Sequence, residues 1–147
     1  MVETKTRVID ADGLLRRLDA CFAGGGVFPL TVTGTSMCPF LRPGRDQVTL
    51  AAPDRPLRRG DVALFLRPDG SPVLHRVVAA DRRGLFFLGD GQLAPEGPVP
   101  RERVLAVAVA AQVNGRLQRP GCLRWEFFRR VWIHPWVRRA WAKLRRR

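Results

Sequence analysis

Residues 60–80 read GDVALFLRPDGSPVLHRVVAA and predict a β-hairpin. The run Val62–Leu66 is apolar throughout, and Val73–Ala80 is a second run that is rich in valine. Between them, Arg67–Gly70 combines proline, aspartate and glycine, which together favour a tight turn. Because the connection is so short, the two strands must pair antiparallel. This hairpin points to an antiparallel β fold.

Further strands and turns continue this pattern on both sides of the hairpin. Strands are predicted at Val27–Thr33, Gln47–Ala51, Leu85–Leu88 and Val104–Val113, and in a short stretch after Asn114-Gly115. Asn114-Gly115 suits a type I′ turn, and residues 89–100 predict a loop. An amphipathic helix is predicted at Ile9–Phe22, ended by Gly24–Gly26. We therefore expect a mainly β, α+β protein: a compact antiparallel β barrel or sandwich preceded by one helix.

The last part of the chain differs in composition from the rest. Residues 116–147 hold 11 basic residues and one acid, Glu126, whereas the rest of the chain holds 15 basic and 12 acidic residues. All four tryptophans also lie there, and helical periodicity predicts two short helices separated at Pro135. The chain is thus divided into an N-terminal helix (1–26), a β domain (27–115) and a basic, Trp/Arg-rich helical tail (116–147).

Composition argues against several classes of protein. The cysteines Cys21, Cys38 and Cys122 are odd in number and widely spaced, so we expect reduced thiols, no metal and no cofactor. The longest apolar run, Val104–Val113, is far too short to cross a bilayer. The N-terminus lacks a signal-peptide pattern. We therefore expect a cytoplasmic monomer, with a peripheral position at the inner face of the membrane as the alternative.

His75 is one of only two histidines and lies in the middle of a predicted strand. Strand alternation places it on one face with Val73 and Val77, a setting in which a histidine is by default part of the core. A neutral imidazole is nevertheless a competent general base near physiological pH if a nucleophile lies within reach.

Ser36 follows Gly34 in a predicted turn or single helical turn and is the candidate nucleophile. Backbone amides at such a turn can stabilise a developing oxyanion, so we expect Thr35, Ser36 and Met37 to contact the oxyanion and the substrate. Cys38 is a second candidate nucleophile. It ranks lower because Met37, Cys38 and the following proline should turn its thiol away from the site.

Four short segments follow one another in a characteristic order: Gly34–Leu41 (GTSMCPFL), Arg59–Val62 (RGDV), His75–Val77 (HRV) and Leu88–Gln92 (LGDGQ). In order and spacing they resemble the type I signal peptidase and repressor-autoprotease superfamily over roughly residues 27–110. The Ser-Met-x-Pro segment is the most specific part. The resemblance implies a signal-peptidase-like β domain and a serine endopeptidase that cleaves precursor, leader or signal-type peptides, with small side chains beside the scissile bond.

The superfamily divides by its general base, which is lysine in some members and histidine in others. The two lysines, Lys5 and Lys143, lie outside the resembling region. His75, in its His-Arg-Val context, matches the histidine type found in endoplasmic-reticulum, archaeal and sporulation-type signal peptidases. The resemblance therefore implies that Ser36 is the nucleophile and His75 the base.

The resemblance also implies supporting acids. Asp90 matches the aspartate of a Gly-Asp-x-Asn stretch, so it is expected to orient His75 and to stabilise its charged form. Gln92 replaces the usual asparagine. Glu96 stands at the position of a second acid, one methylene longer, and Asp61 is expected to cap a turn instead.

Two non-catalytic functions remain open. One is an inactive peptide-binding module that uses the same groove, and the other is a basic nucleic-acid-binding protein that acts through its tail. Tryptophan and arginine on short amphipathic helices also suit an anionic bilayer interface. We expect the first tail helix to pack on the protein and the second to face a membrane. Its predicted apolar arc comprises Trp136, Val137, Ala140, Trp141 and Leu144, with arginines opposite.

Overall fold

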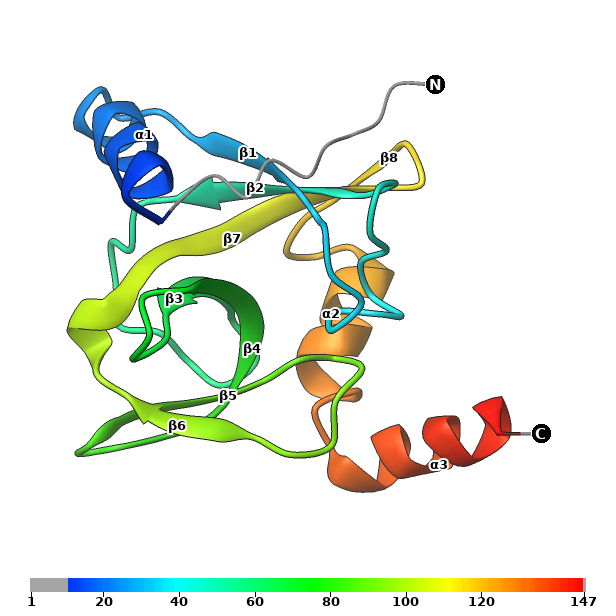
Figure 1. The fold of residues 1–147 in the computed structure, drawn as a ribbon. Helices are drawn as coiled ribbons and strands as arrows, with labels where there is room; N and C mark the ends of the chain where they lie inside the picture. The colour runs from blue at the N-terminus through cyan, green and yellow to red at the C-terminus, as the bar shows by residue number, and fades with distance from the viewer. Residues whose placement is uncertain (1–10, 147) are drawn as a thin grey trace.

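The computed structural model describes residues 11–146, in which one eight-stranded antiparallel sheet is accompanied by three α-helices (Figure 1). The elements, in chain order, are α1 (Ala11–Ala23), β1 (Phe28–Thr31), β2 (Gln47–Ala51), β3 (Val62–Leu66), β4 (Pro72–Asp81), β5 (Gly84–Leu88), β6 (Glu96–Val99), the short 3₁₀ helix η1 (Arg101–Arg103), β7 (Val104–Val113), β8 (Arg116–Gln118), α2 (Leu123–Arg130) and α3 (Pro135–Arg145).

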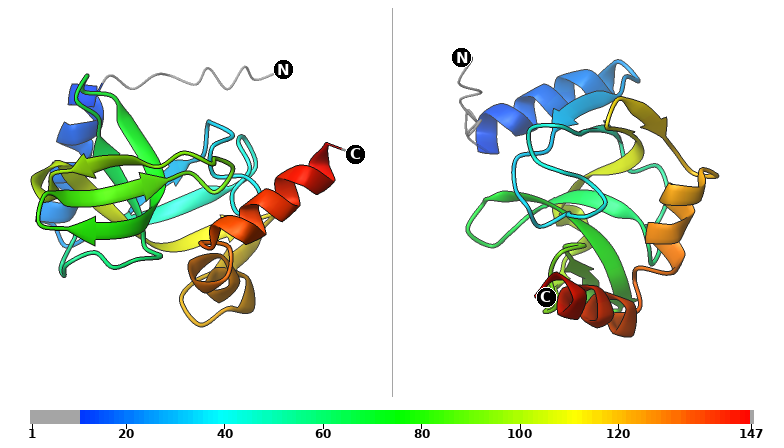
Figure 2. Two further views of the ribbon diagram at one scale, coloured as in Figure 1. Left: turned by 90° about the horizontal axis from the view of Figure 1, so that it is seen from below. Right: turned by 90° about the vertical axis from the view of Figure 1, so that its right-hand side faces the viewer.

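The strand order is β1-β2-β7-β3-β4-β5-β6, and β8 pairs with β7. The sheet curls so that β1, β2 and β7 lie on one side and β5 and β6 on the other (Figure 1). Within the described chain β1 and β6 do not pair with each other, so the barrel does not close. The predicted antiparallel α+β class is confirmed. The two views of Figure 2 place α1 on one side of the sheet and α2 and α3 on the opposite side.

Most strand bounds follow the sequence pattern. The predicted bounds of β2, β3 and β7 coincide with those of the structure. Asn114 and Gly115 have φ values of 51° and 79°, as the type I′ turn requires. The prediction of a loop throughout residues 89–100 is wrong, because β6 lies within it and pairs with β5. Gly97 and Pro98 look like turn residues, but an edge strand tolerates proline.

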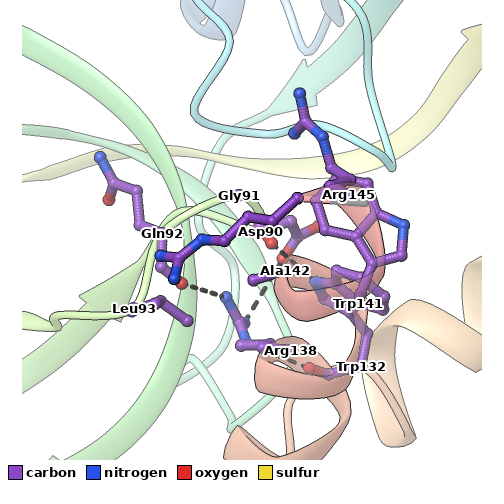
Figure 3. A pocket seen from close by; sticks show the side chains of 10 residues that line it. Asp90, Gly91, Gln92, Leu93, Trp132, Arg138, Trp141, Ala142 and Arg145 are labelled. Atoms are coloured by element: carbon purple, nitrogen blue, oxygen red, sulfur yellow. Dashed lines mark hydrogen bonds and ion pairs between the residues drawn. The ribbon is translucent and has the colours of Figure 1, made fainter.

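The second tail helix, α3, packs on the protein with part of the face that was expected to carry solvent-exposed arginines. Arg138 is only 2% exposed and reaches under the helix, where it donates hydrogen bonds to the carbonyls of Gly89, Gln92 and Trp132 (Figure 3). Trp136 and Leu144, predicted on the apolar arc, are exposed. Arg138 was expected to be exposed to solvent. Its long side chain instead donates hydrogen bonds to three backbone carbonyl groups. None of the helices in the described part is long and apolar enough to cross a lipid bilayer.

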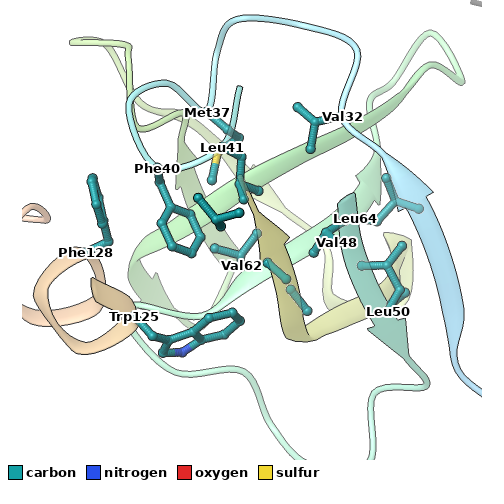
Figure 4. Close-up of a cluster of buried hydrophobic side chains, with 14 of the residues drawn as sticks. Val32, Met37, Phe40, Leu41, Val48, Leu50, Val62, Leu64, Trp125 and Phe128 are labelled. Carbon is teal, nitrogen blue, oxygen red and sulfur yellow. The ribbon is translucent and has the colours of Figure 1, made fainter. Parts of the chain in front are cut away.

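The larger core cluster joins α1, the sheet, α2 and the turn that follows Ser36. Figure 4 shows the part of it between the sheet, this turn and α2. Met37, Phe40 and Leu41 from that turn are buried, and the Phe40 ring contacts the rings of Trp125 and Phe128 on α2. The prediction that the first tail helix packs on the protein is therefore confirmed. Since three side chains just after Ser36 are anchored in close-packed core, the Ser36 turn is held rigidly.

Candidate active site

Ser36 and His75, 39 residues apart in the chain, come together in the folded protein. Ser36 lies in the turn after β1, and His75 lies in the middle of β4, opposite Ala63 of β3. The Ser36 Oγ atom is 3.1 Å from His75 Nε2, which is hydrogen-bond distance. The structure thus brings the predicted nucleophile and base within reach of proton transfer.

The other imidazole nitrogen faces Glu96. Its Nδ1 atom lies 3.1 Å from Glu96 Oε1. Within residues 11–146 this nitrogen makes no well-aligned hydrogen bond, so the contact acts mainly through charge. Arg67 in turn grips both oxygens of Glu96 at 2.9 Å each. The result is a continuous chain of contacts from Ser36 through His75 and Glu96 to Arg67.

Asp90 does not occupy the position predicted for it. Both of its carboxylate oxygens accept hydrogen bonds from Arg76 at 2.8 Å, and Arg138 Nη2 lies 3.6 Å away. His75 and Arg76 are neighbours on β4, so their side chains point to opposite faces of the sheet. Because Asp90 binds the Arg76 side chain, it lies on the face of the sheet away from His75. The prediction that Asp90 orients His75 is wrong, and Glu96 takes that position.

The Gly89–Gln92 loop packs against the backbone of the turn that carries Ser36. Gly91 N–H donates to the Ser36 carbonyl at 2.8 Å, and the Gln92 side-chain oxygen accepts from Gly89 N–H. A Cβ atom at residue 89 would lie 2.5 Å from the Ser36 carbonyl, and one at residue 91 would lie 2.9 Å from the Cys38 carbonyl. The glycines of the Gly-Asp-Gly motif thus allow two backbones to approach closely.

Ser36 and His75 line a cleft of about 720 Å³ that runs between the end of β1 and the β3–β4 hairpin. The apolar part of its wall includes Leu14, Leu30, Val32, Leu64 and Val73. Cys38 is not among the residues that line it, which removes the geometric case for the cysteine as nucleophile. The second histidine, His134, precedes α3 and does not line it either.

The turn offers donors for a developing negative charge. Within residues 11–146 the amides of Ser36 and Met37 donate no hydrogen bond, whereas Cys38 N–H is already bonded to the Thr35 carbonyl. Ser36 and Met37 are therefore available as oxyanion donors. Thr35 contributes its carbonyl to the turn itself.

The protonation states suit base catalysis. Burial lowers the pKa of His75 below its usual value of 6.5, Glu96 partly opposes this effect, and the positive charge of Arg67 reinforces it. The hydrogen bonds from Arg67 lower the pKa of Glu96. At neutral pH the imidazole is neutral and the carboxylate is ionised.

Sequence reasoning missed Arg67 and Arg138. Arg67 belongs to the turn segment of the β3–β4 hairpin, where a charged residue carries no functional signal, and it reaches Glu96 across 29 positions of sequence. Asp61 has the structural role predicted for it, since its carboxylate accepts hydrogen bonds from Arg58 N–H and from Arg55.

The described residues contain no cluster of histidine, cysteine, aspartate and glutamate that could hold a metal ion. No protein-family model matches the chain, and no curated protein matches it in sequence. The geometry of the site therefore carries the functional conclusion.

Proposed function

We propose that the protein is a serine endopeptidase in which Ser36 is the nucleophile, His75 is the general base, and Glu96 with Arg67 orients the imidazole. The observation that carries this proposal is the 3.1 Å contact between Ser36 Oγ and His75 Nε2, with Glu96 against the opposite nitrogen of the same ring. An isolated Ser–His contact is common, but a buried ring held between a serine and a carboxylate within a cleft is typical of acyl transfer.

The first half of the reaction forms an acyl-enzyme. Nε2 of neutral His75 accepts the proton of Ser36 while Oγ attacks the carbonyl carbon of the scissile peptide bond. The carbonyl oxygen becomes an oxyanion, which the Ser36 and Met37 amides stabilise. His75 then donates its proton to the leaving amine. In the second half, His75 activates water, which attacks the acyl-enzyme and releases Ser36.

Glu96 and Arg67 have separate effects on the base. A carboxylate beside Nδ1 favours the tautomer that carries its proton there, which leaves Nε2 free to accept one from serine. The same negative charge stabilises the imidazolium that forms after proton transfer. Arg67 holds Glu96 in place by two hydrogen bonds, and its positive charge adds to the lowering of the His75 pKa by burial.

The cleft suits an extended peptide. Val32 exchanges hydrogen bonds with the β2 side, as donor to the Asp46 carbonyl and as acceptor from Gly44 N–H. Backbone N–H and C=O groups alternate in direction along a strand, so those of Thr31 and Thr33 point away from β2, to the free edge of β1. Both residues line the cleft. A peptide that adds to this edge would run toward Ser36. The apolar wall supports apolar side chains, as in the leader or signal-type peptides of the histidine-type signal peptidases that the sequence resembles.

Covalent labelling tests the nucleophile directly. Incubation with a fluorophosphonate is expected to add one probe mass to the wild-type chain, as measured by intact mass spectrometry, and none to Ser36→Ala. The matched control is Ser71→Ala. Ser71 also lines the cleft, but its hydroxyl donates to Asp69, so this variant should label like the wild type. Labelling that survives Ser36→Ala would contradict the proposal, and peptide binding without labelling would favour the non-catalytic module.

The pH profile tests the base and its two neighbours. Because the pKa of His75 is lowered, the acid limb of the labelling rate should lie below pH 6.5, with activity lost as pH falls through that pKa. Glu96→Gln removes a charge that raises the pKa of His75, so the limb should move to lower pH. Arg67→Gln removes a charge that lowers this pKa, so the limb should move to higher pH. Shifts in the same direction would show that these side chains do not act on His75 through their charge.

A further inference from the structure

The outer face of α3 carries an apolar strip that the protein does not cover. Trp136, Ala140 and Leu144 follow one another at a spacing of four residues, which places them along one side of a helix. Trp136 is 70% exposed and Leu144 is 68% exposed. Large apolar side chains at such exposure, aligned on one helix, are typical of a surface that contacts another phase or partner.

The opposite face of α3 holds the helix in this orientation. Arg138 Nη1 donates to the Gly89 carbonyl at 2.7 Å, and Arg138 Nε donates to the Trp132 carbonyl at 3.0 Å. The Trp141 ring packs edge-on against that of Trp132, with centroids 5.4 Å apart. Figure 3 shows Arg138 between the helix and the Asp90–Leu93 loop. Rotating α3 about its axis to bury the strip would break these hydrogen bonds of Arg138. The strip therefore stays exposed.

The charges around the strip are not neutralised. Arg139 and Lys143 lie beside the strip on the helix; both are exposed, and neither forms an ion pair within residues 11–146. By contrast, Arg129 and Arg130 on α2 share Glu126. The outer face of α3 thus combines an apolar strip with a set of unpaired cations.

We propose that the outer face of α3 docks on an anionic lipid bilayer, with the helix lying parallel to the surface. Trp136 and Leu144 would enter the headgroup–acyl boundary while Arg139 and Lys143 contact anionic headgroups. Aliphatic side chains favour lipid over nucleic acid, since only Trp136 could stack on a base. The proposal is independent of the peptidase activity.

Vesicle sedimentation and tryptophan fluorescence test this proposal on the full chain. The protein should pellet with vesicles that mix phosphatidylcholine and phosphatidylglycerol, should remain in the supernatant with phosphatidylcholine alone, and should be released by salt. The emission should shift to the blue on binding. Trp125 and Trp132 are buried and Trp141 is half-buried, so Trp136 should account for the shift. Trp136→Phe should therefore keep most of the binding and lose most of the shift.

Paired variants separate the strip and the charges from nonspecific effects. Trp136→Ala with Leu144→Ser should weaken partitioning by at least about tenfold, and Arg139→Gln with Lys143→Gln should do so by about tenfold. The controls are Leu117→Ser, an exposed leucine on β8, and Arg16→Gln with Arg17→Gln on the outside of α1. Both controls should bind like the wild type. All of these sites are exposed, so the variants should fold.

Two outcomes would overturn the proposal. In one, the α1 arginine control weakens vesicle binding as much as the α3 variant, which would show that net charge alone drives association. In the other, a single-stranded oligonucleotide binds through the α3 cations while anionic vesicles do not bind, which would assign the surface to nucleic acid.

Discussion

Replacing His75 with glutamine is expected to lower the rate at which Ser36 is acylated by about 10²–10⁴-fold, the range typical of a general base. Glutamine is close in size to histidine and can still contact the Ser36 hydroxyl, but it cannot accept its proton at neutral pH. The measurement is the second-order rate of fluorophosphonate labelling, followed by intact mass, together with cleavage of a peptide pool followed by mass spectrometry.

The matched control for this substitution is His134→Gln. His134 is the other imidazole of the chain, and it lies outside the cleft at the start of α3. Its replacement should leave the labelling rate within about twofold of the wild type, since His134 does not contact Ser36 or line the cleft. Equal rates for wild type and His75→Gln, in a variant whose thermal unfolding is unchanged, would remove His75 from the mechanism.

Replacing Asp90 with asparagine is expected to lower the free energy of unfolding by about 3–5 kcal/mol, because it leaves buried cations without a counter-charge. Arg76 and Arg138 are each almost wholly buried, and Asp90 is the one carboxylate that contacts them within residues 11–146. Urea denaturation measures the loss.

The control for Asp90→Asn is a similar pair on the surface. Asp81 and Arg83 lie 2.9 Å apart, but their side chains are 40% and 69% exposed, so solvent screens the contact. Asp81→Asn should therefore cost no more than about 1 kcal/mol. Asp90→Asn should also move the acid limb of the labelling rate less than Glu96→Gln does. A larger shift, without loss of stability, would restore Asp90 as a partner of His75.

Two acid–arginine pairs lie on opposite faces of β4 and have different roles. Arg67 lines the cleft, and Glu96 lies between Arg67 and His75; both are partly exposed, so they can adjust the charge and orientation of His75. Asp90 and Arg76 are buried, and their geometry is bidentate, as a desolvated ion pair requires. The two carboxylates are six residues apart in sequence, but their environments assign them different roles.

The candidate nucleophile and base could be predicted from sequence because each belongs to a local pattern. Ser36 lies in a turn marked by Gly34, and His75 is the only histidine in a strand pattern. The strands β2, β3 and β7 were likewise predictable, since short runs rich in β-branched and apolar residues and the glycine or proline turns beside them are local signals. For the same reason the type I′ turn at Asn114-Gly115 was visible in the sequence.

Tertiary structure alone decided which acid serves the histidine and which face of α3 points inward. Glu96 reaches His75 only because β6 pairs with β5 and β5 with β4, a register set by contacts distant in sequence and hidden by Gly97 and Pro98. Arg138 turns inward because the Gly89–Gln92 loop presents carbonyls to it. Charged side chains with long stems have no fixed place in a sequence pattern, since their positions depend on which partners the folded chain brings within reach.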